Sequence, residues 1–286
     1  MFKSMNERGL IAPFFNTFAS HFTNLLRNYP VRLIDTHTHL YLPEFDYDRD
    51  LVVQKALDSG IERMLLPNID SGTIENMLKM CREYPGVIFP MIGLHPGSVK
   101  DNYFEELKVI KEQASDGKYI AVGEIGIDLY WDKSHITQQL YAFEKQVILS
   151  KELNLPVVIH ARDSFSEIFS ILDKHAGHGL NGVFHSFTGG LADVEKILSY
   201  DFYLGINGIV TFKNSGLGKV VTQIPQNRIL LETDSPYLSP APKRGIRNES
   251  SHLIYINEFL AKLLKISSDQ LAEITYANAM KLFTLK

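Results

Sequence analysis

Two hydrophobic patterns alternate along the chain from Val31 to the C-terminus. Short apolar runs rich in β-branched residues are each followed by an amphipathic stretch whose apolar positions recur near helical spacing. The short runs predict strands at residues 31–36, 61–66, 87–92, 119–124, 156–160, 181–185, 202–206 and 228–232. The amphipathic stretches predict helices at residues 48–59, 71–84, 102–115, 136–154, 163–176, 190–200, 213–223, 249–265 and 268–283. Several strand runs are hydrophobic throughout, which is typical of strands covered on both sheet faces.

The number and order of these units indicate the fold. Eight strand–helix units between residues 31 and 286 match a (β/α)8 barrel, a TIM barrel of the α/β class, whose usual length is about 250 residues. An open doubly wound sheet is the competing interpretation, but it usually has fewer strands, and no GxGxxG motif follows the first predicted strand. Because no linker, charge block or repeat interrupts residues 31–286, we expect a single barrel domain there.

Residues 1–30 form an extension ahead of the first predicted strand. Their apolar positions recur near helical spacing and are interrupted by Asn, Thr, Ser and His. We therefore expect an added helical segment packed on the barrel domain, or a start site assigned too far upstream. Targeting or membrane association is the remaining alternative for this segment.

Composition excludes several classes of protein. Apolar residues make up 45% and charged residues 22% of the chain, as in an ordinary globular protein, and the net charge of −4 argues against a broad basic surface for long nucleic acids. Cys81 is the single cysteine, so no intrachain disulfide is possible and a reducing, cytoplasmic location is expected. No apolar run approaches the roughly 18 residues of a membrane span, so we expect no membrane association of the barrel.

Histidine and acidic residues are concentrated where the predicted strands end. Carboxyl ends of parallel barrel strands meet at one face, where enzymes with this fold build their active sites. The side chains at these ends are His37, His39, His95, Glu124, His160, His185, Glu232 and Asp234. We therefore expect one polar site at this face of the barrel.

Spacing and residue type suggest that this site holds metal ions. His37 and His39 lie two residues apart, so both rings can point the same way and share one cation, although an HxH motif alone is a weak signal. Glu124 lies between Gly123 and Gly126, which permit close backbone approach. Its two carboxylate oxygens can bridge two cations, and the alternative is an acid paired with a lysine at the rim.

The remaining histidines have two interpretations each. His160 and His185 end hydrophobic runs and are either ligands or buried core histidines, whereas His95 is either a ligand or a contact to substrate. Asp128 either orients a histidine or caps a loop.

Two acids end the last predicted strand. Glu232 and Asp234 are two residues apart and are expected to share a face. One can ligate a cation and accept a proton from water, while the other hydrogen-bonds a ligand or caps the loop. Cation pairs held by such residues generate hydroxide near neutral pH, so the pattern favours a hydrolase.

Five further residues on predicted rim loops are candidates for substrate binding. Arg162, Arg244 and Arg247 can hold phosphate oxygens, although a single rim cation is more often a solvated charge. Tyr130 and Trp131 can stack on a base or pack on a neighbouring loop.

Six motifs together resemble a known family. They are DTHTHL at 35–40, GLHP at 93–96, GEIGID at 123–128, PVVIHARD at 156–163, FHSF at 184–187 and ETDSPYL at 232–238. In this order they resemble the TatD family of metal-dependent deoxyribonucleases, which have amidohydrolase-like (β/α)8 barrels, and the resemblance covers the chain from about Val31. The extension at residues 1–30 is unusual for that family, and RGIRNES at 244–250 replaces the commoner RGKRNEP.

The resemblance implies a ligand set for two divalent ions, whose identity (Mg²⁺, Mn²⁺ or Zn²⁺) stays open. Four residues would hold one ion and three the other, with one residue shared. The first set is His37, His39, Glu124 and Asp234, and the second is Glu124, His160 and His185. His95 and residues 244–250 would face the substrate phosphate.

The resemblance also implies an activity, namely hydrolysis of DNA from the 3′ ends of single strands. The residues themselves support a two-cation hydrolase, in which Glu124 bridges the ions and Asp234 takes a proton from the attacking water, and a net charge of −4 suits a short terminal segment better than long duplex. The alternatives are another hydrolase on this barrel, such as a D-aminoacyl-tRNA deacylase or an ester or amide hydrolase, and a non-catalytic metal-binding protein. A monomer is expected.

Overall fold

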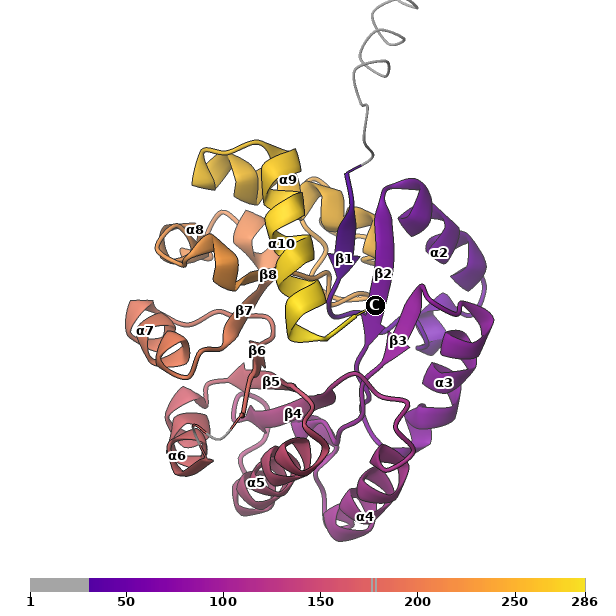
Figure 1. The fold of residues 1–286 in the computed structure, drawn as a ribbon, viewed down its shortest axis with the longest axis vertical. Coiled ribbons are helices and arrows are strands. Elements are labelled where there is room, and N and C mark those ends of the chain that lie inside the picture. The colour runs from indigo at the N-terminus through magenta and orange to yellow at the C-terminus, as the bar shows by residue number, and fades with distance from the viewer. Residues whose placement is uncertain (1–30, 176, 178, 286) are drawn as a thin grey trace, which may run out of the picture. The chain divides into compact units, whose positions relative to one another are not determined.

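Eight parallel strands close into a ring in the computed structural model, which describes residues 31–175, 177 and 179–285 (Figure 1). The strands are β1 (Leu33–Asp35), β2 (Ile61–Leu66), β3 (Ile88–Pro90), β4 (Val122–Asp128), β5 (Val157–Arg162), β6 (Gly182–Phe184), β7 (Tyr203–Ile206) and β8 (Ile229–Leu231). Regular pairing joins β1–β3 and β4–β8. Parallel bridges from Ile92 to Val122 and from Thr38 to Ser235 close the two gaps between these sheets. The predicted TIM barrel is therefore confirmed.

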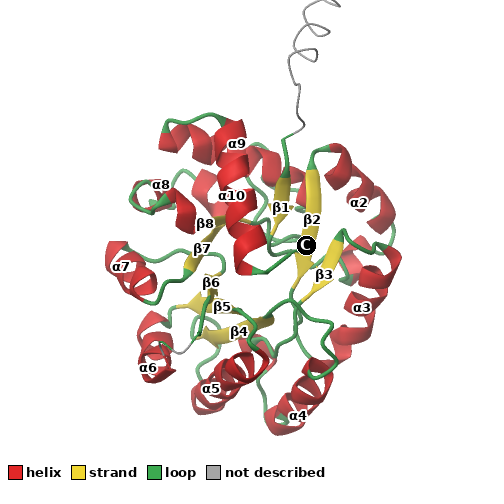
Figure 2. Cartoon of the chain, viewed as in Figure 1, coloured by secondary structure: helices red, strands yellow, loops and turns green. Residues whose placement is uncertain are grey.

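Helices surround the strands, as Figure 2 shows in red around yellow. They are α2 (Arg49–Asp58), α3 (Ile74–Glu83), α4 (Tyr103–Ala114), α5 (Ile136–Leu153), α6 (Phe165–His175), α7 (Leu191–Ser199), α8 (Leu217–Val221), α9 (Leu253–Leu264) and α10 (Ser268–Leu282). Short 3₁₀ turns lie between them, at Pro43–Phe45, Ser71–Thr73, Pro96–Ser98, Gly208–Thr211, Gln226–Arg228 and Ser250–His252. The helix predicted within residues 1–30 lies outside the described residues.

The amino-terminal end of the barrel is filled by α10. One apolar side chain from each strand or its immediate flank packs with side chains from the end of the chain. The strand side chains are Ile34, Leu65, Met91, Ala121, Val158, Val183, Tyr203 and Leu230, and those of the C-terminal segment are Tyr276, Ala279, Leu282, Phe283 and Leu285. This burial removes the amino-terminal end of the ring from water and contributes to the hydrophobic stabilisation of the barrel.

Two strands extend further than the sequence predicts. β4 continues to Asp128 and β5 to Arg162, because Ile127 pairs with Ala161 and Asp128 with Arg162. Gly126 has a φ of 144°, and a Cβ there would lie 2.0 Å from the His160 carbonyl oxygen, so only glycine permits this approach. Glu124 and the following segment are therefore part of the barrel wall and not of a loop.

The predicted helix at 213–223 shrinks to the five residues of α8. Gly216 adopts a left-handed conformation with a φ of 69° directly before the helix, which prevents an earlier start. The predicted helix was too long because apolar spacing alone does not reveal where the backbone leaves helical torsion angles.

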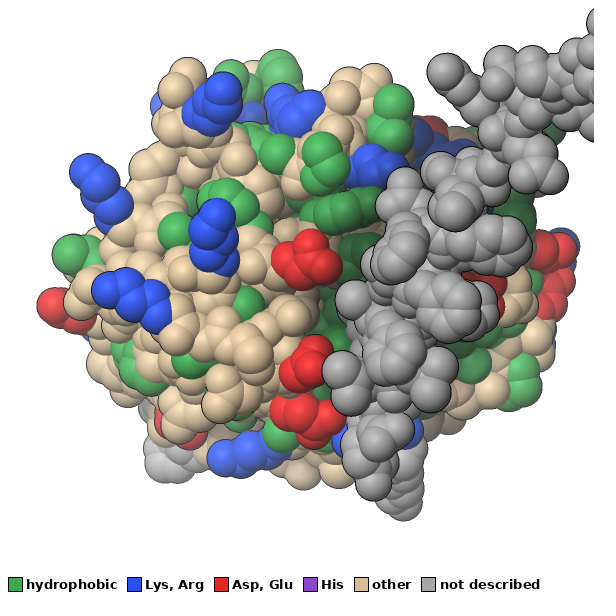
Figure 3. Space-filling view, turned by 90° about the horizontal axis from the view of Figure 1, so that it is seen from above, with side chains coloured by type: hydrophobic (Ala, Val, Ile, Leu, Met, Phe, Trp, Pro, Cys, Tyr) green, Lys and Arg blue, Asp and Glu red, His purple; other side chains and the backbone are tan. Residues whose placement is uncertain are grey.

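The described surface carries scattered charges. On the face in Figure 3, Lys and Arg side chains stand singly or in small groups, and we see no continuous basic sheet on the part of the chain that is coloured there. Among the described residues, no helix has both the length and the apolar character needed to cross a bilayer.

Candidate metal centre

A cleft of about 840 Å³ opens at the carboxyl end of the barrel strands. Its walls come from β4, β5 and the segments that follow every strand except β5. Of the expected metal ligands, His39, Glu124, His160, His185 and Asp234 line it, while His37 lies fully buried beneath it. The barrel thus brings together residues from distant parts of the sequence, as the resemblance implies.

Glu124 is the centre of this arrangement. Its carboxylate is 2% exposed, and its two oxygens face different groups of histidines. Oε2 lies 3.1 Å from His37 Nε2 and 3.8 Å from His39 Nε2. Oε1 lies within 3.5 Å of a ring nitrogen of three further histidines, which are His95, His160 and His185. A single carboxylate therefore faces five imidazoles and joins the two halves of the cluster.

His39 presents an unprotonated nitrogen to this centre. The Tyr41 hydroxyl donates its proton to the Pro67 carbonyl oxygen at 2.7 Å, so at 3.1 Å from His39 Nδ1 it can only accept. In the neutral ring, Nδ1 of His39 then carries the proton and the Nε2 lone pair is free for a cation; Asp234 Oδ1 lies 3.6 Å from this nitrogen. Tyr41, two residues along the chain, therefore favours the tautomer of His39 that could bind a cation.

His185 is oriented by Glu232. Its Nδ1 lies 3.0 Å from Glu232 Oε1, and the same oxygen accepts the Ser186 backbone N–H at 2.6 Å. Burial opposes the charged ring, but the carboxylates of Glu232 and Glu124 raise the pKa of His185 to about 10. The ring of His185 stacks on His37 with 3.5 Å between centroids, and burial beside this charge lowers the pKa of His37.

His160 lies between two carboxylates. Its Nδ1 faces Glu124 Oε1 at 2.8 Å and its Nε2 faces Asp128 Oδ2 at 3.0 Å. Asp128 also accepts the Tyr130 backbone N–H at 3.0 Å, so both interpretations of Asp128 describe the structure: it orients a histidine and caps a loop. Although burial disfavours the charged ring, these two carboxylates raise the pKa of His160.

The neutral ring of His95 is the opposite tautomer from that of His39. Its Nδ1 accepts the Gly97 backbone N–H at 2.9 Å, so the proton of the neutral ring resides on Nε2. Nε2 lies 3.4 Å from Glu124 Oε1, and the side chain is 22% exposed to the cleft. His95 is therefore built to donate a hydrogen bond at the edge of the cluster.

The period-two expectation for Glu232 and Asp234 was wrong in its geometry. β8 ends at Leu231, and Asp234 has a φ of 56°, so the two residues do not alternate along a strand. Glu232 turns toward His185 while Asp234 turns toward His37 and His39. Asp35 holds this bend, because its carboxylate accepts both the backbone N–H and the hydroxyl of Thr233 at 2.9 and 2.6 Å.

The donor set fits divalent cations. Both nitrogens of His37 are buried without a hydrogen-bond partner, a costly state that a bound cation relieves at Nε2. Burial would raise the pKa of both Glu124 and Asp234, but the surrounding histidines hold the pKa of Glu124 well below its usual range and lower that of Asp234. Both acids are therefore ionised. Ligand atoms converge in three overlapping groups: His37–Glu124–His185, His37–His39–Asp234 and His95–Glu124–His160.

The predicted substrate contacts fall into two groups. Arg162 and Trp131 line the cleft, and the Arg162 guanidinium lies 4.0 Å above the ring of Tyr130 and 5.3 Å from that of Trp131. Arg244 packs on Phe212, and Arg247 forms a two-pronged ion pair with Asp48 at 2.9 and 2.7 Å. Neither of these two arginines is among the residues that line the cleft.

Sequence reasoning missed two glutamines of α5 that support the site. Gln146 accepts the Leu94 N–H at 2.7 Å and donates to the Leu94 carbonyl at 3.2 Å, which fixes the peptide before His95. Gln139 makes the same pair of bonds with Asp128, at 2.9 and 3.3 Å. The available signal was their spacing of seven residues on a face that is otherwise apolar.

Comparison with known proteins decides the family. The profile described as TatD related DNase matches residues 34–284. The chain belongs to this family. It is 39% identical to the uncharacterized metal-dependent hydrolase YabD of Bacillus subtilis over 88% of this chain and 99% of that protein. It is 31% identical to the 3′-5′ ssDNA/RNA exonuclease TatD of Erwinia tasmaniensis over 88% of this chain and 100% of that protein.

A solved structure supports the same assignment. The crystal structure of YJJV, a TatD homologue from Escherichia coli, superposes with a TM-score of 0.84 at 26% identity and covers 90% of this chain and all of that one. The protein is therefore a metal-dependent hydrolase of the TatD family, as the six motifs indicate.

Proposed function

We propose that this TatD-family hydrolase cleaves phosphodiester bonds at the 3′ ends of single-stranded DNA. The observation that carries the proposal is the Glu124 carboxylate, whose two oxygens face separate sets of histidines. Such a shared acid is suited to a pair of cations, and a cation pair suits an in-line displacement at phosphorus. The exonuclease name of the Erwinia tasmaniensis relative supports the substrate class.

Two sets of ligands are proposed for the two ions. His37, His39, Glu124 and Asp234 would hold one, and Glu124, His160 and His185 the other. When bound, the ions lower the pKa of water and neutralise charge on the attacked phosphate. Three available metals, Mg²⁺, Mn²⁺ and Zn²⁺, are compatible with this mixed nitrogen and oxygen set.

The residues of the chain supply the remaining steps. Burial opposes ionisation of Asp234, but the surrounding histidines lower its pKa, so the carboxylate can accept the proton of the attacking water. The Gly97 hydrogen bond to Nδ1 leaves the proton of the neutral His95 ring on Nε2, which lies beside Glu124 Oε1 in the cleft and can donate to a phosphate oxygen there. Arg162, fixed on Tyr130, is placed at the cleft wall to attract the same charge.

A second candidate is hydrolysis of a carboxylic ester such as a D-aminoacyl-tRNA. The higher identity to a relative named only as a metal-dependent hydrolase keeps this candidate open. The residue of β4 in the site is Glu124 and not a lysine that could be carboxylated. This argues against the further alternative of an amide hydrolase with this barrel.

The test is a parallel assay on metal-stripped protein reconstituted with Mg²⁺, Mn²⁺ or Zn²⁺. Single-stranded DNA labelled at the 3′ or the 5′ end and a D-aminoacyl-tRNA are offered under the same conditions. We expect early release of the 3′ label, and loss of that release in Asp234→Asn but not in Glu258→Gln, an exposed acid of α9. Deacylation without DNA cleavage would replace the proposal with the second candidate.

A further inference from the structure

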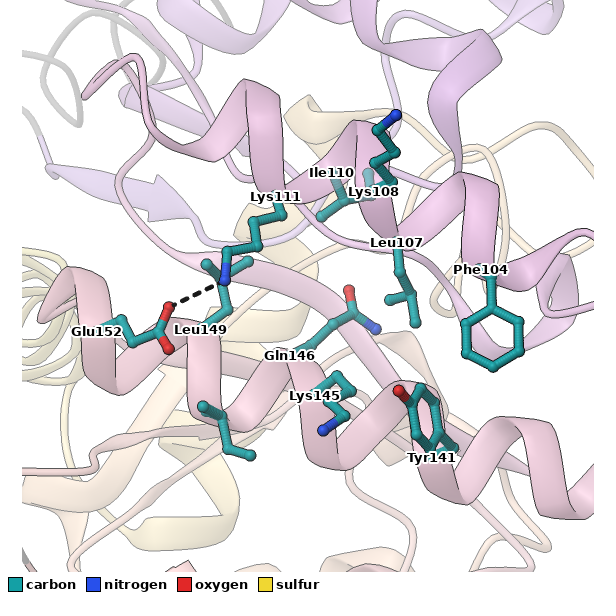
Figure 4. A pocket seen from close by; sticks show the side chains of 11 residues that line it. Phe104, Leu107, Lys108, Ile110, Lys111, Tyr141, Lys145, Gln146, Leu149 and Glu152 are labelled. Carbon is teal, nitrogen blue, oxygen red and sulfur yellow. Dashed lines mark ion pairs between the residues drawn. The ribbon is translucent and has the colours of Figure 1, made fainter.

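A second cavity lies outside the metal centre, along the groove between α4 and α5. It has a volume of about 410 Å³, and Figure 4 shows the side chains that line it. They are Phe104, Leu107, Lys108, Ile110, Lys111, Tyr141, Lys145, Gln146, Ile148, Leu149 and Glu152. Three lysines against one glutamate make this lining cationic, although the chain as a whole carries a net charge of −4.

The two ends of the groove differ. In Figure 4, Lys111 and Glu152 form an ion pair at one end, with 3.6 Å between their charged atoms. At the other end lie two exposed rings, Phe104 and Tyr141, with 5.4 Å between centroids and 68° between planes. The groove is therefore closed by charge at one end and opens at the other between aromatic faces.

The aromatic end lies toward the catalytic face. A barrel helix runs back along the strand that precedes it, so the start of each helix lies at the carboxyl end of the strands. Phe104 is the second residue of α4 and Tyr141 the sixth of α5. Lys100, three residues before α4, and His135, directly before α5, line the catalytic cleft. The two cavities therefore follow one another along α4 and α5.

The charges of the groove are available to a ligand. Lys108 and Lys145 are exposed and form no ion pair with any residue in the described part of the chain, whereas Lys111 is engaged by Glu152. The Lys145 ammonium lies 5.1 Å from the centroid of the Tyr141 ring. Aromatic rings interleaved with unpaired lysines along a groove are the usual means of binding a single-stranded nucleic acid without sequence preference.

We propose that the α4–α5 groove binds the part of a single-stranded nucleic acid that extends away from the scissile end. Bases would stack on Phe104 and Tyr141, and Lys108 and Lys145 would contact phosphates. This inference rests on the proposed nuclease function. The groove would be a binding site remote from the reacting phosphate. It would therefore strengthen the binding of long strands and not of short ones.

The first test compares a thymidine trinucleotide with a thymidine strand of about 20 nucleotides. We expect the unaltered protein to have a KM for the long strand about tenfold lower than for the trinucleotide. In Lys108→Gln/Lys145→Gln this preference should shrink to less than about threefold, and the slope of log KM against log salt should fall by about 1.4, or about 0.7 for each phosphate that is no longer neutralised. Phe104→Ala/Tyr141→Ala should reduce the preference without changing the salt slope.

The matched control is Lys219→Gln/Lys262→Gln, which removes two exposed lysines from α8 and α9. It should retain the preference and the salt slope. Equal effects of the control and the groove variant would overturn the groove and leave only a general charge effect. A KM that is the same for both strand lengths in the unaltered protein would overturn the groove while the nuclease function stands. Cleavage of neither strand would overturn the nuclease function itself.

A second measurement needs no altered protein. A phosphorothioate thymidine strand carrying 5-iododeoxyuridine upstream of its 3′-terminal trinucleotide is irradiated with the unaltered protein, and the modified peptide is identified by mass spectrometry. Attachment to the peptides of Phe104 or Tyr141 supports the proposal. Attachment confined to the metal cleft overturns the proposal. A change of sedimentation coefficient in the groove variants also overturns it, because the groove would then be a contact between protein copies.

Discussion

The amino-terminal end of the barrel is filled by apolar side chains of α10, whereas the carboxyl end gathers five histidine rings around one buried carboxylate. At the lower end, each side chain gains stability by leaving water. At the upper end, His37 is buried and neither of its nitrogens is hydrogen-bonded, although Nε2 lies 3.1 Å from Glu124 Oε2; this arrangement costs free energy that a cation would relieve. The same barrel thus gains stability at one end and accommodates strained electrostatics at the other.

The largest expected effect is at the upper end. Glu124→Gln removes the charge that both proposed ligand sets share, so we expect activity to fall by more than about 10³-fold. Metal content measured by mass spectrometry of the native protein should fall in parallel. Glu258→Gln on exposed α9 is the control, and full metal content in Glu124→Gln would show that the carboxylate does not join the two sets.

The next effect tests the lower end. Phe283→Ala removes a buried ring beneath the barrel, where its side chain is 3% exposed, and should lower the free energy of unfolding by about 3–5 kcal/mol. Urea unfolding provides this value, and kcat at 25 °C should stay within about twofold because Phe283 packs in the apolar cluster at the end of the barrel away from the cleft. Phe259→Ala, at a 37% exposed position, is the matched control. A large fall in kcat with little loss of stability would contradict the division between the two ends.

A smaller effect is expected at a residue that only orients a ligand. Glu232→Gln keeps the shape of the side chain but removes the charge that faces His185 Nδ1 at 3.0 Å. We expect metal affinity to fall by about 10–100-fold, with partial recovery of activity at raised metal concentration. Isothermal titration of the stripped protein measures the affinity. Loss of activity that excess metal does not restore would instead place Glu232 in the chemical step.

The smallest effect is the dependence of stability on pH in the metal-free protein. The histidines hold the pKa of Glu124 below its ordinary value of 4.5, so the unfolded chain binds this proton at a higher pH than the folded protein. Its contribution to stability is complete above pH 4.5 and is lost as the pH falls, by at most about 1.4 kcal/mol per pH unit. Urea unfolding between about pH 6 and about pH 3.5 should show a shallower decline in Glu124→Gln, and an unchanged slope would contradict this coupling.

Much of the fold was predictable because hydrophobic spacing is a local signal. All eight strands lie within or beside the predicted runs, and eight of the nine predicted helices agree with the structure to within a few residues. The exceptions depend on contacts between strands and on backbone torsions. β4 is longer because Gly126 permits close pairing with β5, and α8 is shorter because Gly216 adopts a left-handed conformation.

The site was predictable in its members and not in its electrostatics. The six motifs name the residues around Glu124, but the hydroxyl of Tyr41 selects the tautomer of His39 and the Gly97 N–H selects that of His95. The glutamines of α5 that fix the peptides of Leu94 and Asp128 lie 52 and 11 residues further along the sequence than those peptides. None of these roles follows from sequence spacing, because a hydrogen bond depends on direction in space.

The sequence by itself determined the alternation of strand and helix, the family and the chemical types of residue at the strand ends, since these depend on local periodicity and on motif identity. Only the tertiary structure decided which oxygen of Glu124 faces which histidine, that Glu232 and Asp234 turn toward different rings, and that lysines and aromatic rings of α4 and α5 line one groove. The physical reason is that ring closure of the barrel sets distances between segments nearly 200 residues apart, and electrostatic interactions depend on those distances.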